Sequence, residues 1–588
     1  MVTRLFRSVT QHSLMVAMLV LLALFLLYPI WLTVWGAFDA GFQGGPGDLV
    51  GTIVKDPGSI VTLEHVSLVF KDPTTVQGLV NAGLIAVCTT TFAALLALPL
   101  AMLSARRRFP LRGVFNTLIL VPLILPPFVG AIGVRAIMGR AGALNALLGT
   151  DLDLLGSARF WGVVVVEALH LYPIIYLNAV AALANVDPAL EEAAENVGIG
   201  PIRRFVRVTL PLIRPGLFAG ATIVFIWSLT ELGTPLVFDF TRVTPVQIFE
   251  GLQEVESSAA PYALTAVMLG ASVLLYAVGR GLFGRRGHAM YAKASRASSE
   301  RPMSVLGSLV AMGAFTVVTL LALVPHVGVV LTSLSDVGAW YRSVLPESFT
   351  LDHYRTALGD EQAFGSVVNS LKYASLAMLL DLGLGLLIGY LVVRTRLWGR
   401  SLLDALCMLP LGVPGLVLAF GFVAMTLRWP FASGDPLHGT LEVFGTDPNP
   451  LALIVIAYGV RRLPYIVRAT AAGLEQTSGE LEEAAINLGA TRLTAVRRVI
   501  VPLIMANLLA GSLLVFSFSM LEVSDSLILA QQQEDYPITK AIYAFIGRLG
   551  DGAYIASAMG VWGMALLGVT LVGASLLIGR RLGSIFRV

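Results

Sequence analysis

Long apolar stretches alternate with short polar segments along the whole chain. A helix needs about 20 apolar residues to cross the hydrocarbon core of a bilayer. Twelve stretches meet this requirement, at about 14–36, 79–104, 114–138, 160–183, 215–237, 262–283, 305–333, 368–393, 401–427, 450–474, 505–529 and 554–580. Because lipid offers the backbone no hydrogen-bonding partners, each stretch should be helical. The pattern predicts an all-α integral membrane protein with about 12 transmembrane helices.

The two halves of the chain repeat one polar segment. Residues 190–213 read LEEAAENVGIGPIRRFVRVTLPLI and residues 481–504 read LEEAAINLGATRLTAVRRVIVPLI, with 12 of 24 positions identical at an offset of 291. Isolated residues inside the apolar stretches recur at nearly the same offset, among them Asn81 as Asn369 and Arg106 as Arg394. We therefore predict an internal duplication.

The duplication divides the chain into two repeats of six helices each. The first is expected at 1–283, a polar linker at 284–304, and the second at 305–588. An even number of helices per repeat gives the repeats parallel topology, with a pathway between them.

Composition agrees with a membrane protein and excludes several other classes. The chain is 56% hydrophobic and 13% charged, whereas soluble domains carry about 25% charged residues. The net charge of +3 gives no indication of a nucleic-acid partner. The two cysteines, Cys88 and Cys407, lie in apolar stretches and predict neither a disulfide framework nor a metal site.

Arginine is concentrated in alternate loops, which predicts the orientation. The loops that begin at Arg106 and Arg394, and both copies of the repeated segment, are basic, whereas the intervening loops are mixed or acidic. We expect both termini and both repeated segments to be cytoplasmic. The apolar run after Arg4 and Arg7 is too long for a typical signal peptide, so we interpret it as a retained first helix.

The repeated segment resembles the EAA-x3-G-x9-I-x-L-P signature of permeases in binding-protein-dependent ABC importers. Val208, Val499 and Val501 replace apolar residues of that signature. The resemblance implies a fused, two-repeat type I permease in which segments 188–213 and 479–504 dock onto a separate ATPase. The residues that it places in this coupling role are Glu192, Ala193, Ala194, Gly198, Glu483, Ala484, Ala485 and Gly489.

The local sequence explains why each copy should form a short helix. Asp187 can cap the first helix, with Pro188 at its first position. In the second copy, Thr477 and Glu480 have the spacing of a capping box. Gly198 and Gly489 can adopt the left-handed conformation that ends a helix.

The chain contains no phosphate-binding loop for ATP. That loop requires a Gly-Lys pair, and none of the lysines at 55, 71, 293, 372 and 540 follows a glycine. We expect ATP and Mg²⁺ to bind a partner ATPase present in two copies, and no cofactor to bind this chain. The resemblance further implies an extracytoplasmic solute-binding protein as partner. Whether the chain binds a metal is left open.

Ionisable residues inside apolar stretches indicate a possible translocation pathway. The candidates are Arg461, Arg462, Glu231, Glu522, Asp525 and His170. The alternative for them is a set of ion pairs between helices, for example Arg461 with Glu231. For Glu167, His170 and Asp381 we favour such a structural role.

The fused arrangement resembles permeases for ferric iron, thiamine and aminoethylphosphonate, and is related to those for polyamines. Residues 231–249 and 521–543 resemble the ferric-iron group most. Ferric iron is therefore the expected solute of a bacterial inner-membrane permease. The rival classes are an ion-coupled secondary transporter, which would not need paired EAA segments, and a membrane-embedded enzyme.

Overall fold

The computed structural model describes residues 2–40, 61–153, 155, 159–283, 301–432, 434–444 and 448–578. Most of these residues are helical, and the only strands among them are β1 (Arg107–Arg108) and β2 (Arg301–Pro302), which pair in parallel. Most of the expected linker, up to residue 300, lies outside the described residues.

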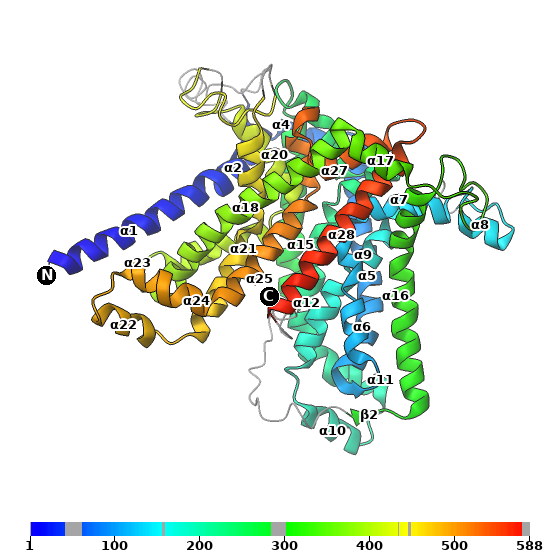
Figure 1. Cartoon of the computed structure of the whole chain (residues 1–588), viewed down its shortest axis with the longest axis horizontal. Helices are drawn as coiled ribbons and strands as arrows, with labels where there is room; N and C mark the ends of the chain where they lie inside the picture. Colours follow the sequence, from blue (N-terminus) through cyan, green and yellow to red (C-terminus); the bar gives the residue numbers. More distant parts are fainter. Residues whose placement is uncertain are drawn as a thin grey trace.

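Long helices form the body of the molecule (Figure 1). In the first half they are α1 (Val2–Leu22), continued by η1 (Ala23–Leu27) into α2 (Tyr28–Phe38), then α5 (Pro73–Arg106), α9 (Arg159–Leu183), α12 (Leu210–Leu229) and α15 (Ala260–Phe283). In the second half they are α16 (Val305–Leu334), α18 (Glu361–Arg394), α21 (Leu451–Gln476), α25 (Met505–Met520) and α28 (Gly552–Ile578).

The described residues contain nine helices long and apolar enough to cross a membrane, or eleven if two bent helix pairs are each counted as one span. One further stretch, α21, has 26 residues but carries Arg461, Arg462 and Arg468. All twelve expected stretches are therefore helical, and the expected all-α membrane architecture is confirmed.

Two equivalent spans, the third expected in each half, are each divided into three helical segments. The stretch 114–138 consists of α6 (Arg112–Leu118), η2 (Val121–Ile124) and α7 (Pro127–Met138). Its counterpart 401–427 consists of α19 (Arg400–Met408), η6 (Leu409–Leu411) and α20 (Gly415–Thr426), and bends by 106°. Prolines at equivalent positions explain both breaks, because each removes a backbone donor and clashes with the preceding turn.

The first helix of each half packs against the other half. In Figure 1, α16 stands beside helices of the first half, whereas α1 runs along the second. At equivalent positions, Gly133 of α7 meets the carbonyl of Pro325, and Gly421 of α20 meets that of Pro29. A Cβ atom at Gly133 or Gly421 would lie 2.2 or 2.6 Å from those oxygens. Only glycine permits these crossings.

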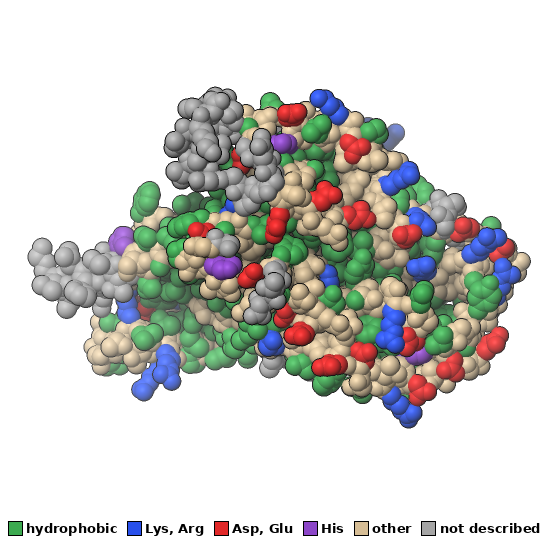
Figure 2. All heavy atoms as spheres, turned by 90° about the horizontal axis from the view of Figure 1, so that it is seen from above, with side chains coloured by type: hydrophobic (Ala, Val, Ile, Leu, Met, Phe, Trp, Pro, Cys, Tyr) green, Lys and Arg blue, Asp and Glu red, His purple; other side chains and the backbone are tan. Residues whose placement is uncertain are grey.

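The bundle has two distinct ends in Figure 1. The lower face carries the loops of the repeated segment, and the upper face carries the short helices α4 (Glu64–Lys71) and α17 (Asp352–Gly359). Equivalent histidines fix these two helices: His65 Nε2 lies 3.2 Å from the carbonyl oxygen of Asp39, and His353 Nε2 lies 2.9 Å from that of Ser335. Seen from above, acidic and basic side chains are interspersed over the upper face (Figure 2).

Candidate functional site

The repeated segments form two matching helix–turn units on the lower face. The short helices are α10 (Pro188–Asn196) and α22 (Glu480–Asn487). Asp187 caps α10 by accepting a hydrogen bond from the Ala189 amide at 3.0 Å, as the sequence predicted. Gly198 and Gly489 follow the helices with φ of +78° and +92°, which confirms their role as helix stops.

The predicted capping box of the second copy is wrong. The amide of Glu480 is hydrogen-bonded to Ser478 Oγ at 3.2 Å, and the residue that precedes α22 is Gly479. The Thr477 hydroxyl instead donates to the carbonyl of Leu474 and accepts from Arg394. Thr477 therefore contacts Arg394 instead of capping α22, which is the role that its spacing from Glu480 had predicted.

The EAA residues of both helices present a similar surface. Glu192 and Ala193 are exposed and Ala194 is buried, while Glu483 and Ala484 are exposed and Ala485 is half-buried. Each motif therefore exposes one acid and one small side chain and turns its last alanine toward the protein.

Apolar side chains at equivalent positions surround the two motifs, a feature that our sequence analysis missed. Relative exposure is 75% for Val197 and 90% for its counterpart Leu488, and 80% for Ile202 and 78% for its counterpart Leu493. Leu190 and Leu481, a third matched pair, are half-exposed. The available signal was the recurrence of apolar residues in two otherwise polar segments. We call these six residues the apolar anchors.

Polar contacts hold α10 to the membrane helices. The guanidinium of Arg106, at the end of α5, lies 3.1 Å from Glu191 Oε2, and Glu191 Oε1 accepts a 2.8 Å hydrogen bond from Thr209. Glu191 thus connects α10 to the end of α5 and to η3 (Phe205–Thr209), the segment that leads into α12.

The second half holds α22 by different donors. Arg394 donates to the carbonyl oxygens of Leu474 and Thr477 at 3.0 and 2.8 Å, and Tyr390 donates to Glu482 Oε1 at 2.5 Å. The short helix α10 is therefore attached to the end of α5, and α22 with the turn before it is attached to the end of α18.

Four of the pathway candidates form one buried cluster. Arg461 Nη1 lies 2.5 Å from Glu522 Oε1 and 3.3 Å from Asp525 Oδ2, and Arg462 forms an ion pair with Glu522 Oε2. Side-chain exposure is 18% or less for all four. Gly415 makes room for Arg461, because a Cβ atom there would lie 2.3 Å from the guanidinium.

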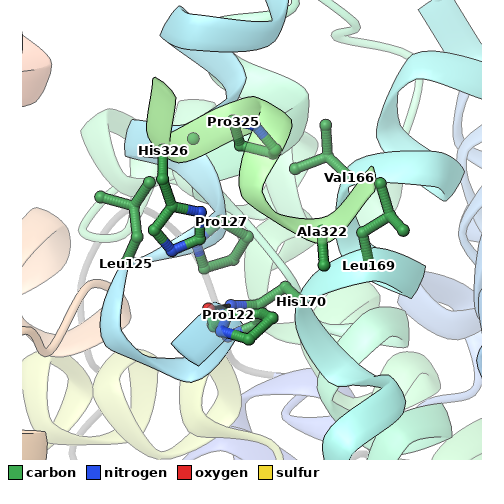
Figure 3. A pocket seen from close by; sticks show the side chains of 10 residues that line it. Pro122, Leu125, Pro127, Val166, Leu169, His170, Ala322, Pro325 and His326 are labelled. Atoms are coloured by element: carbon green, nitrogen blue, oxygen red, sulfur yellow. Dashed lines mark hydrogen bonds between the residues drawn. The ribbon is translucent and has the colours of Figure 1, made fainter. Parts of the chain in front are cut away.

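Glu231 and His170, the remaining candidates, form no hydrogen bond or ion pair with this cluster among the described residues. Glu231 accepts hydrogen bonds from the amide and hydroxyl of Thr234, both at 3.2 Å. The ion pair that we considered between Arg461 and Glu231 is not formed. His170 Nδ1 lies 2.8 Å from the carbonyl oxygen of Pro122, at a small pocket that His326 also lines (Figure 3).

Two further intramembrane acids differ in how they are satisfied. Glu167 accepts hydrogen bonds from Ser228 and Thr89, which agrees with the structural role that we favoured. Asp381 is 1% exposed, and neither of its oxygens has a hydrogen-bond partner within the described chain. Across the same residues, no three His, Cys, Asp or Glu side chains are grouped as metal ligands.

A duplicated helical membrane protein with paired EAA helices on one face has the organisation of an ABC importer permease. Comparison with known families agrees: residues 97–287 and 382–582 each match the binding-protein-dependent transport system inner membrane component. The two matches cover about two thirds of the chain and confirm its duplication. The chain belongs to this family, whose members are multi-pass inner-membrane permeases and not enzymes.

Individual relatives are more distant. The chain is 28% identical over 496 residues to the ferric transport system permease protein FbpB of Actinobacillus pleuropneumoniae, across 80% of this chain and 66% of that protein, so the match spans about two thirds of its length. It is 30% identical over 206 residues to the molybdenum transport system permease protein ModB of Escherichia coli, across 33% of this chain and 90% of that protein.

A solved structure also matches over part of the chain. A bacterial ABC transporter involved in the import of the acidic polysaccharide alginate aligns with a TM-score of 0.34 and 17% identity, over 49% of this chain and 98% of that one.

Proposed function

We propose that this chain forms the membrane pathway of an ATP-driven importer, and that ferric iron is its solute. The observation that carries the importer proposal is the pair of equivalent helices, α10 and α22, each with an exposed Glu-Ala pair and apolar anchors. Exposed apolar side chains at matched positions favour a partner that docks on both copies.

The partner that fits two copies of one surface is two copies of one ATPase. In this proposal Glu192, Ala193, Ala194 and Gly198, with Glu483, Ala484, Ala485 and Gly489, form the docking motifs, which lie in the repeats expected at 1–283 and 305–588. The lower face and both termini are cytoplasmic, and a solute-binding protein approaches the upper face. ATP binding moves both coupling helices, and the tethers to α5 and α18 transmit that movement to the pathway.

The contacts of the arginine–acid cluster support the ion-pair alternative. Arg461 and Arg462 already have carboxylate partners in Glu522 and Asp525, so they hold the helices of the second half together and are not free to bind a solute. A direct pathway role for Glu231 and His170 stays a prediction.

Ferric iron is proposed because the ferric transport system permease protein FbpB matches 80% of the chain. Molybdenum is the second candidate, because a relative named for it matches a third of the chain. Aminoethylphosphonate, thiamine and polyamines are the remaining alternatives. Such a permease receives its solute from a binding protein, so its own residues carry little information on the solute.

The importer proposal is tested by isolating the tagged chain in mild detergent from its native cells and identifying what accompanies it. An ATPase at about two copies per chain is the expected result. Replacing both Glu192 and Glu483 by alanine should leave the chain in the membrane and abolish ATP-dependent uptake of radioactive iron into vesicles. Uptake that continues without ATP would instead support the ion-coupled transporter.

A further inference from the structure

One lysine is buried where the two halves meet at the upper face. Lys540 lies on α27 (Ile538–Ile546) and is 7% exposed. Its ammonium donates a 2.8 Å hydrogen bond to the carbonyl of Leu527 and lies 5.6 Å from the ring centroids of Tyr536 and Phe249. Phe249 belongs to α14 (Thr244–Glu250) of the first half, so this cation–π contact joins the two halves.

The first half has no lysine at the position equivalent to Lys540. α14 and α27 are equivalent helices, with Pro245 and Pro537 at matching positions at an offset of 292. The residue of α14 that corresponds to Lys540 is Ile248, which is fully buried. An apolar side chain therefore fits this environment in one half, and packing alone does not require a cation in the other.

The ammonium is poorly satisfied where it lies. An ammonium group has three N–H donors, and only the one to Leu527 has a hydrogen-bond acceptor among the described residues. No carboxylate of the described chain lies within ion-pair distance, although Asp535 and Glu250 are close in sequence to Tyr536 and Phe249. Burial without a counter-ion lowers the pKa of Lys540 to about 8. Such a group gains most from an anionic oxygen.

Phe249 of the first half lies against Lys540 of the second. Phe249 also makes an edge contact with Tyr543 of α27, with ring centroids 6.1 Å apart, so α14 and α27 close against each other at this level. Beside Lys540, the Thr539 hydroxyl donates a 2.6 Å hydrogen bond to the carbonyl of Glu522, which ties α27 to the arginine–acid cluster. Separation of the halves would remove Phe249 and leave Lys540 on the second half, facing the opening.

We propose that Lys540 binds an anionic oxygen of the solute, of the carboxylate or phosphate type, once the two halves separate at the upper face. Phe249 covers this site in the closed arrangement, so the site exists only in the open one. The inference rests on the proposed importer function and adds the chemical class that its opening receives. Iron in complex with anionic ligands, or a free oxyanion, would each supply such an oxygen to Lys540.

The test uses the scarcity of lysine in this chain, which has five: Lys55, Lys71, Lys293, Lys372 and Lys540. Pyridoxal 5′-phosphate is an anionic aldehyde that forms a Schiff base with amines, and borohydride fixes the product. The permease–ATPase complex in nanodiscs is labelled at pH 8, both at rest and after trapping with ATP and vanadate, and labelled lysines are found by mass spectrometry. Lys372 is exposed and its ammonium lies 5.0 Å from the Tyr373 ring, which makes it the internal control.

Labelling of Lys540 should rise severalfold in the trapped complex while that of Lys372 stays constant. Citrate or inorganic phosphate should then protect Lys540 selectively, and the more effective anion identifies the oxygen type. Equal labelling of Lys540 in both states, or labelling that neither anion reduces, would overturn the inference alone. Failure to trap any complex with an ATPase would overturn the importer proposal itself.

Transport gives an independent readout. Lys540→Met should raise the solute concentration for half-maximal uptake severalfold, and Lys540→Arg should restore most of the loss because it keeps the charge. Ile248→Met is the matched control in the first half and should leave that concentration unchanged. A purely structural role for Lys540 would lower the amount of folded protein and leave the half-maximal concentration as it was.

Discussion

Glu522 and Glu231 occupy equivalent positions, but only Glu522 is paired with arginines. Replacing each glutamate by glutamine should therefore destabilise the protein by different amounts. Glu522→Gln leaves Arg462 without its carboxylate and leaves Arg461 with Asp525 alone, 3.3 Å away. Removing one partner of a buried ion pair costs about 3–5 kcal/mol, because the other charge stays buried. Glu231→Gln weakens only hydrogen bonds from Thr234, at a cost of about 1 kcal/mol.

The measurement is the free energy of unfolding in mixed micelles with increasing SDS, followed by the far-ultraviolet circular dichroism of the helices. The loss for Glu522→Gln should exceed that for Glu231→Gln by about 2–4 kcal/mol. Asp525→Asn should give an intermediate loss, since Glu522 remains to neutralise both arginines. If the losses for the two glutamine variants agree within about 1 kcal/mol, the cluster does not hold the second half together and our reasoning on it is wrong.

Three further predictions concern the two faces of the molecule. Val197→Ser and Leu488→Ser should each weaken ATPase binding by about 1.5–3 kcal/mol, which is the free energy of burying such a side chain. The control is Leu549→Ser, because Leu549 is also highly exposed but lies on the upper face; it should not change the amount of ATPase recovered. Arg106→Ala should loosen α10 and lower the ratio of solute moved to ATP hydrolysed, measured in proteoliposomes, while ATPase binding persists. The free energy of unfolding should rise between about pH 8 and pH 10, because the folded state with its lowered Lys540 pKa binds fewer protons there than the unfolded chain. The Lys540→Met variant should lack this rise. A rise of equal size in the variant would show that other groups cause it.

The sequence was most informative where function depends on short segments. The EAA helices, their glycine stops and the duplication follow from local spacing, since capping and turn geometry act within a few residues. The apolar anchors were visible too, as Val197 and Leu488 recur in polar surroundings, but recurrence alone did not show that both side chains point into solvent.

Tertiary choices were harder to predict. Glu231 and Glu522 occupy equivalent positions, so sequence spacing could not tell which of them would pair with Arg461. In the structure Arg461 pairs with Glu522 and with Asp525, which lies on α26 (Ser524–Leu529) of the same half. The stretches 114–138 and 401–427 were predicted as continuous helices because both are apolar throughout. Mean hydropathy does not account for the backbone donors that prolines remove, and these prolines break the helices.

The crossing of the first helices between the halves has a consequence for biosynthesis. α2 packs against α20, so a helix made near the start of translation meets its partner about 380 residues later. At about 5–20 residues per second, that interval is roughly 20–75 seconds. During this time the carbonyl of Pro29 has no Gly421 to meet, and among its long-helix neighbours α2 has only α15 of its own half to pack against. Completion of the fold thus depends on a segment synthesised late, and chains that end before α20 should lack the contact between α2 and the second half.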